Sequence, residues 1–202
     1  MSLDTILALA AIAVTMTWTP GPNNVMLTAS GANFGLWRTL PHAFGVAVGF
    51  PVMLFLVALG LGGVLQTFPL LAAALSWTGF IAMVWFSWKI ASAPVSGQSH
   101  DGSARSKPLN LWQAAAFQWV NPKAWTFAIW IAASHAATSD ALTAVAMAAV
   151  VFLISGLGSS VAWSAFGAVI GRVLGAGLRL RVFNLAMAAM LFGSAIWLTA
   201  TR

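Results

Sequence analysis

Apolar residues fill six long stretches of the chain, and short polar or turn-forming segments separate them. A helix that crosses a bilayer needs about 20 apolar residues, and each stretch is long enough. The segment 91–110 is rich in serine, glycine, proline and charge, so it is the one true linker. The predicted membrane spans are 3–35, 41–64, 70–90, 111–136, 141–170 and 182–200.

The first stretch is too long for one straight crossing and contains its own break. Its 33 residues would extend roughly 50 Å as a helix, against a hydrocarbon core of roughly 30 Å. Pro20, Gly21 and Pro22 lie near its middle, where prolines remove backbone donors and glycine weakens the helix. Unpaired backbone groups are costly in lipid, so the break is expected beside protein or a watery cavity. Whether this broken helix crosses or re-enters stays open.

A second break is predicted 100 residues later, at Asn121-Pro122-Lys123 in the fourth stretch. Each half of the chain then starts with a proline-broken helix and continues with two unbroken ones. Three spans per half give the halves opposite orientations, which is the inverted-repeat plan of many transporters. The predicted fold is therefore an all-α integral membrane protein with six transmembrane helices in two inverted repeats, 1–95 and 110–202.

Composition supports this interpretation. Of 202 residues, 60% are hydrophobic and 6% are charged, whereas a soluble domain has roughly 25% charged residues. One membrane domain over 1–202 is expected. The net charge of +6 forms no continuous basic face, so a nucleic-acid partner is not expected. The absence of cysteine excludes disulfides and thiolate chemistry.

The basic residues indicate how the spans are oriented. Arg202 alone marks one side, and Lys123 falls within a span. Positive loops face the cytoplasm, which places the linker there and both termini outside. The side predicted to face the cytoplasm carries Arg38, Lys89, Arg105, Lys107, Arg172, Arg179 and Arg181.

The two breaks together predict a binding site for a zwitterion. Asn121 and Pro122 have the order of a helix N-cap and first turn, and Gly21-Pro22 can play the same part. Two half-helix N-termini facing each other, with the charge of Lys123, would suit a carboxylate. The candidate binding residues are Pro20, Gly21, Pro22, Asn23, Asn24, Gln118, Asn121, Pro122 and Lys123.

Freed carbonyl groups supply the complementary charge. The prolines remove the helical partners of the carbonyls of Met16, Trp18 and Gln118. These oxygens are expected to accept hydrogen bonds from a substrate ammonium. The predicted partners are thus a small amino acid and the lipid bilayer, with the oligomeric state, a homo-oligomer included, left open.

Simpler interpretations exist for most of these features. Prolines kink many membrane helices, and Lys123 can instead extend to an interface. The cluster Ser155, Ser159, Ser160 and Ser164 could line a polar path, but packing is the favoured interpretation. An intramembrane enzyme or an assembly subunit is the alternative function. The chain has no glutamate, cysteine or tyrosine and no metal-ligand spacing, so neither enzyme chemistry nor a metal or cofactor is expected.

The segments 19–24 and 121–123 resemble motifs of the lysine exporter (LysE/RhtB-type) amino-acid efflux superfamily. Ser76-Trp77, Trp85-x-x-Trp88-Lys89-Ile90 and Lys107-Pro108 look most like the cysteine/O-acetylserine exporters within it. The resemblance implies a multi-pass exporter in the bacterial inner membrane, driven by the proton motive force. Many members have aspartate where this chain has Asn23, so the usual carboxylate for coupling is missing here.

Overall fold

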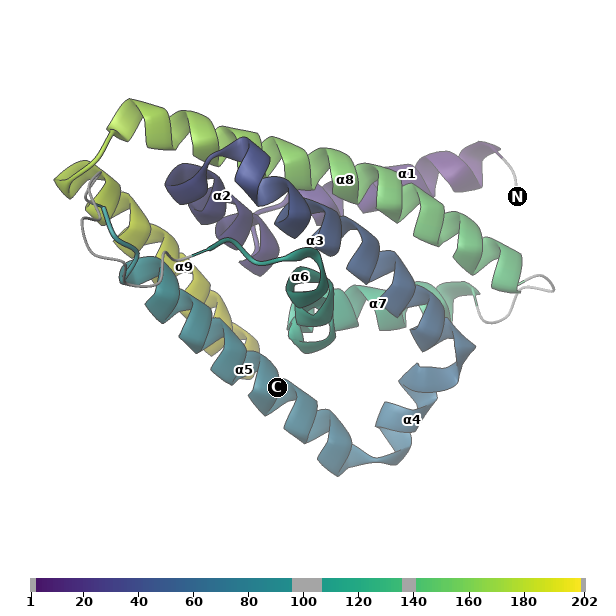
Figure 1. Cartoon of the computed structure of the whole chain (residues 1–202). Helices are drawn as coiled ribbons and strands as arrows, with labels where there is room; N and C mark the ends of the chain where they lie inside the picture. The colour runs from purple at the N-terminus through teal and green to yellow at the C-terminus, as the bar shows by residue number, and fades with distance from the viewer. Residues whose placement is uncertain (1–2, 96–106, 136–140, 201–202) are drawn as a thin grey trace.

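The computed structural model of the chain describes residues 3–95, 107–135 and 141–200, and their regular structure is helical throughout. The predicted all-α class is confirmed for these residues (Figure 1). The elements are α1 (Leu3–Trp18), α2 (Pro22–Phe34), α3 (Leu36–Leu56), a π-helical turn (Val57–Leu61), α4 (Gly62–Thr67), α5 (Pro69–Ala91), α6 (Leu111–Phe117), a 3-10 turn (Gln118–Val120), α7 (Pro122–His135), α8 (Ala141–Leu174) and α9 (Leu178–Ala200).

Four continuous helical segments of the described chain are long and apolar enough to cross a membrane. They are Leu36–Thr67, Pro69–Ala91, Ala141–Leu174 and Leu178–Trp197. The bent pair α1 and α2 makes five if it counts as one span. The stretch 111–136 does not qualify, because α6, the 3-10 turn and α7 divide it into pieces. Its longest piece, α7, has 14 residues, or about 21 Å, less than the hydrocarbon thickness.

The first break lies where the prolines predict it. Helix α1 ends at Trp18, α2 begins at Pro22, and their axes differ by 54°. Gly21 is the N-cap of α2 in an extended conformation and supplies no capping side chain. The N–H groups of the first turn of α2 therefore have no intrahelical partner and point away from the helix.

The second break shows the predicted capping at Asn121. The Oδ1 atom of Asn121 accepts a hydrogen bond from the N–H of Lys123 at 3.1 Å, and Pro122 is the first residue of α7. Upstream, Asn110 and Gln113 form reciprocal hydrogen bonds of 2.9 and 3.1 Å that start α6. This capping box places the beginning of α6 at the end of the predicted linker.

Helix α2 is held against α8 by backbone contacts at glycines. A Cβ atom built on Gly31 would lie 2.1 Å from the carbonyl oxygen of Ser164, and one on Gly167 would lie 2.1 Å from that of Thr28. Gly171 meets the next turn of α2 in the same way. Only glycine allows two helix backbones to approach this closely. The C-terminal half of α2 is therefore fixed in place by α8.

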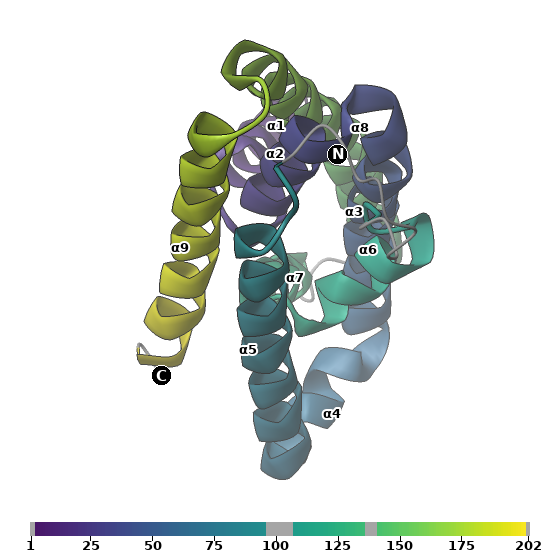
Figure 2. The same cartoon turned by 60° about the vertical axis from the view of Figure 1, so that its left-hand side comes forward.

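The second broken segment is held in the same manner between α3 and α5 (Figure 2). A Cβ atom on Gly45 of α3 would lie 2.3 Å from the carbonyl oxygen of Leu111. A Cβ atom on Gly79 of α5 would lie 2.1 Å from that of Val120. The segment 111–120 is thus held by α3 at its first residue and by α5 at its last, directly before α7 begins.

One end of the molecule carries nearly all the described positive charge. The N–H of Gly177 donates to the carbonyl of Val95 at 2.9 Å, which joins the α8–α9 turn to the segment after α5. The α2–α3 junction lies at the same end, toward the upper left of Figure 1. We call this the basic end; it carries Arg38, Lys89, Lys107, Arg172, Arg179 and Arg181.

Candidate functional site

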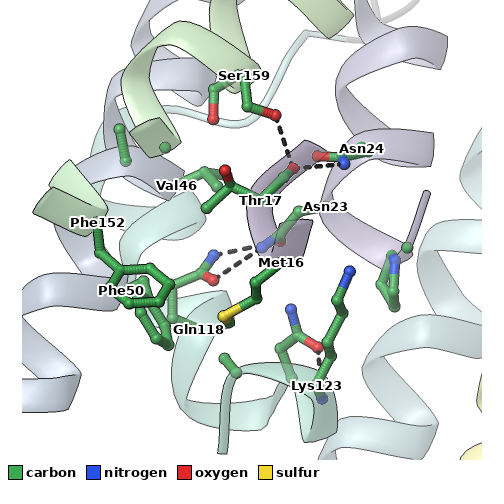
Figure 3. Close-up of a pocket in the computed structure, with 17 residues that line it drawn as sticks. Met16, Thr17, Asn23, Asn24, Val46, Phe50, Gln118, Lys123, Phe152 and Ser159 are labelled. Carbon is green, nitrogen blue, oxygen red and sulfur yellow. Dashed lines mark hydrogen bonds between the residues drawn. The ribbon is translucent and has the colours of Figure 1, made fainter. Parts of the chain in front are cut away.

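The two broken segments meet at a cavity of about 60 Å³ (Figure 3). A volume of this size has room for roughly four water molecules or a small polar group. Seven of the nine predicted binding residues line it, whereas Pro20 and Pro122 do not. The seven are Gly21, Pro22, Asn23, Asn24, Gln118, Asn121 and Lys123.

Lys123 joins the two breaks across the cavity. Its Nζ atom donates to the carbonyl oxygen of Thr19 at 3.2 Å. A Cβ atom on Gly21 would lie 3.2 Å from both Nζ and Cδ of Lys123, so the ammonium rests against the glycine. No carboxylate among the described residues lines this cavity. The site is thus electropositive, with the ammonium beside the uncapped N-terminus of α2.

Asn23 and Gln118 form a reciprocal amide pair between the two segments. The Nδ2 atom of Asn23 donates to Oε1 of Gln118 at 2.9 Å, and Nε2 of Gln118 donates to Oδ1 of Asn23 at 3.3 Å. Gln118 is fully buried and also donates to the carbonyl of Ala114 at 3.0 Å. Each amide oxygen retains capacity for a further donor.

Two backbone carbonyls at the first break, those of Thr17 and Thr19, accept side-chain hydrogen bonds and were not among the predicted ones. The oxygen of Thr17 accepts from Nδ2 of Asn24 at 2.9 Å and from Oγ of Ser159 at 2.7 Å. The oxygen of Thr19 accepts from Asn24 as well as from Lys123. Because α1 ends at Trp18, the N–H groups four residues ahead no longer reach these oxygens. The break therefore frees carbonyls in addition to those opposite the prolines.

The carbonyl of Gln118 is also different from the prediction. It accepts a hydrogen bond from the N–H of Asn121 at 3.3 Å, within the 3-10 turn. The tighter turn recovers a partner that an α-helix would have lost at Pro122. Gln118 therefore contributes to the cavity through its side-chain amide.

Sequence reasoning missed the apolar wall of the cavity. Phe50 of α3 and Phe152 of α8 lie with ring centroids 5.1 Å apart, and Met16 and Val46 complete that side (Figure 3). Nothing distinguishes these residues from ordinary core in the sequence. Ser159 and Ser160 do line the cavity, although packing was the favoured interpretation of the serine cluster.

Gly21→Ala should displace Lys123 without unfolding the protein. The added methyl group would lie 3.2 Å from the end of a flexible side chain, which must shift by a few tenths of an ångström. The backbone of Gly21, at φ −172° and ψ −179°, is open to any residue. We expect the rate of solute transport in liposomes to fall about three- to tenfold, with an unchanged melting temperature. This loss corresponds to a free-energy change on the order of 1 kcal/mol. Gly63→Ala, which meets no atom within 4 Å, is the control, and equal transport by both variants would contradict the geometry.

Comparisons with known proteins identify relatives of this chain. Over 106 residues the chain is 34% identical to the cysteine/O-acetylserine efflux protein of Salmonella typhimurium and 35% identical to that of Escherichia coli K12. The matched region is 52% of this chain and 52% of each relative, so the chain spans about half the length of the curated relatives it matches. No solved structure matches significantly. The model of the family described as LysE type translocator matches residues 14–202, and the chain therefore belongs to the LysE translocator family.

Proposed function

We propose that the protein exports small amino acids or their derivatives across the bacterial cytoplasmic membrane. The observation that carries the proposal is that both breaks contribute to one cavity containing the ammonium of Lys123. Discontinuous helices that meet in this way are typical of substrate sites in secondary transporters. The names of the efflux relatives make cysteine and O-acetylserine the first substrates to test.

The substrate carboxylate would bind between Lys123 and the free N–H groups at the start of α2. A helix N-terminus and an ammonium together favour a negative group. The substrate ammonium would then face the amide oxygens of Asn23 and Gln118, which keep lone pairs available. Phe50 and Phe152 would contact the side chain and limit its size.

Helix packing supports the proposed two inverted halves, 1–95 and 110–202, joined through 91–110 in one membrane domain. The first broken segment packs on α8 of the second half, and the second broken segment packs on α3 of the first half. The remaining long helices, α5 and α9, pack on each other. This exchange is expected of a pseudo-two-fold relation. Under the proposal, rocking of the halves gives alternating access, and stretch 111–136 crosses as a broken span.

The basic end is proposed to face the cytoplasm, since positive residues are retained on that side. Arg105 of the same set lies outside the described residues. Export would be coupled to the proton motive force. No carboxylate among the described residues lines the cavity, so a proton carrier would have to differ from the aspartate of other family members.

Counterflow in proteoliposomes tests the proposal. Liposomes that contain the purified protein are loaded with unlabelled O-acetylserine, cysteine, threonine or homoserine. They should accumulate the labelled form of whichever of these is a substrate. An imposed pH gradient should change the rate if protons are coupled. Absence of counterflow for every amino acid, by protein that remains monodisperse, would refute amino-acid transport.

The Asn23–Gln118 pair provides a prediction about coupling between the halves. Asn23→Ala and Gln118→Ala should each lower the melting temperature, because either leaves a polar partner unpaired in the interior. The double variant should lose about 1 kcal/mol less unfolding free energy than the sum of the losses in the two single variants. Thermal unfolding in detergent measures this coupling. Asn23→Ala should also change the rate or substrate preference of export; strict additivity with an unchanged substrate profile would remove the pair from the mechanism.

A further inference from the structure

A second cavity, of about 170 Å³, lies at the basic end. The C-terminal half of α2, the beginning of α3, the end of α5 and residues 107–109 surround it. It shares no lining residue with the cavity between the breaks. Both cavities contact α2, whose buried residues Val25, Met26 and Leu27 pack between its two ends.

His42 lines this second cavity and is 2% exposed. Its Nδ1 atom is buried and has no hydrogen-bond partner within the described part of the chain. The neighbouring polar side chains are already paired: Ser30 with Thr39 at 3.2 Å, and Asn33 with Asn184 at 2.8 and 2.9 Å. Buried polar atoms in folded proteins are normally satisfied, so an imidazole in the cavity wall with an unpaired ring nitrogen indicates a missing hydrogen-bond partner.

The charge of the cavity identifies the ligand class. Lys89 and Lys107 both line it, and no aspartate of the described chain does. The Nζ atom of Lys89 lies 4.2 Å from the centre of the Trp85 ring, a residue that does not line the cavity, and the ring stabilises the ammonium there. Two lysines and a histidine that line the same cavity are suited to the oxygens of an anion, because ammonium groups and an imidazole N–H are all hydrogen-bond donors.

We propose that this cavity is a second ligand site, in which His42, Lys89 and Lys107 bind a carboxylate or phosphate group. A free amino acid and the headgroup of an anionic lipid carry the same oxyanion chemistry, and either can reach this end of the molecule. The existence of this binding site does not depend on the proposed export function. If the protein is an exporter, the site is where substrate from the cytoplasm binds first, and that role rests on the proposed function.

Binding of trifluoroacetate, followed by fluorine NMR line broadening, tests the site directly. The full chain is placed in phosphatidylcholine nanodiscs with Lys123→Gln in every sample, so that the cavity between the breaks does not contribute. Lys89→Gln combined with Lys107→Gln should weaken binding about tenfold, and so should His42→Gln. Both lysines are exposed, so the paired variant remains informative even if the buried histidine cannot be replaced. Arg38→Gln removes an exposed charge at the same end outside the cavity and should leave binding within about twofold.

Added phosphatidylglycerol and added O-acetylserine then distinguish the two sources. Displacement of the probe by the lipid assigns the site to a headgroup, and displacement by the amino acid alone assigns it to the solute. If the paired lysine variant binds like Arg38→Gln, the cavity holds only water and the proposal is wrong. Binding is measured without transport, so the two experiments test separate proposals. Absence of counterflow would contradict export but not the second site, and absence of binding would contradict the second site but not export.

Discussion

Lys123→Met should reduce export by about 100-fold while the protein still inserts and folds. The substitution keeps the length of the side chain and removes the ammonium that lies between Gly21 and the carbonyl of Thr19. Hydrogen bonds to a charged partner are worth about 1.5–3 kcal/mol, and each 1.4 kcal/mol is a factor of ten. A substrate carboxylate that loses this partner has only the N–H groups of α2 to bind. Initial rates of counterflow in proteoliposomes measure the loss.

The control for this substitution is Arg179→Met, which removes one exposed charge at the basic end, far along the chain from both breaks. It should transport at close to the normal rate. Folding of both variants is checked by size-exclusion elution and melting temperature. Normal transport by folded Lys123→Met would exclude the ammonium from substrate binding, and the proposed polarity of the site would have to be abandoned.

The positions of the breaks could be predicted because their causes are local. Pro20, Pro22 and Pro122 remove backbone donors wherever they occur in a helix, and Asn121 is a strong N-cap in any context. We expected the breaks to converge for a more general reason: backbone groups without hydrogen-bond partners are not exposed to lipid. Seven of the predicted residues line one cavity for these reasons.

What the sequence did not reveal depends on contacts between distant segments. The apolar wall of Phe50 and Phe152 has the same composition as any core. The carbonyls of Thr17 and Thr19 became available because α1 stops at Trp18, and the exact final residue of a helix is not fixed by the position of a proline alone. The break within 111–136 was predicted from Asn121 and Pro122, but the contacts that hold it were not. Gly45 of α3 lies against Leu111, and Gly79 of α5 lies against Val120.

Gly167→Ala should disrupt the fold, because α2 and α8 touch backbone to backbone at this position. The new Cβ atom would lie 2.1 Å from the carbonyl oxygen of Thr28 and 2.8 Å from its carbonyl carbon. Neither atom can rotate away, so the helices must separate by about 1 Å and lose contact over neighbouring turns. Overpacking a well-packed interior costs about 1–3 kcal/mol, and a clash with the backbone of α2 instead of a movable side chain places this variant at the upper end. We expect a markedly lower melting temperature and little protein in the membrane fraction.

Gly193→Ala is the matched control for this prediction, since it lies in the interior of α9 and its Cβ atom would meet nothing within 4 Å. Alanine there removes only the entropic disadvantage of glycine, so the variant should gain about 0.5–1 kcal/mol. The two Gly→Ala substitutions should change the free energy of unfolding in opposite directions. This difference separates the effect of packing from that of helix propensity. Displacement of α2 would also move its N-terminus out of the cavity, so any Gly167→Ala protein that survives should transport poorly. A Gly167→Ala protein as stable and active as Gly193→Ala would show that α2 and α8 are not in contact here, and the position of the binding cavity would lose its structural basis.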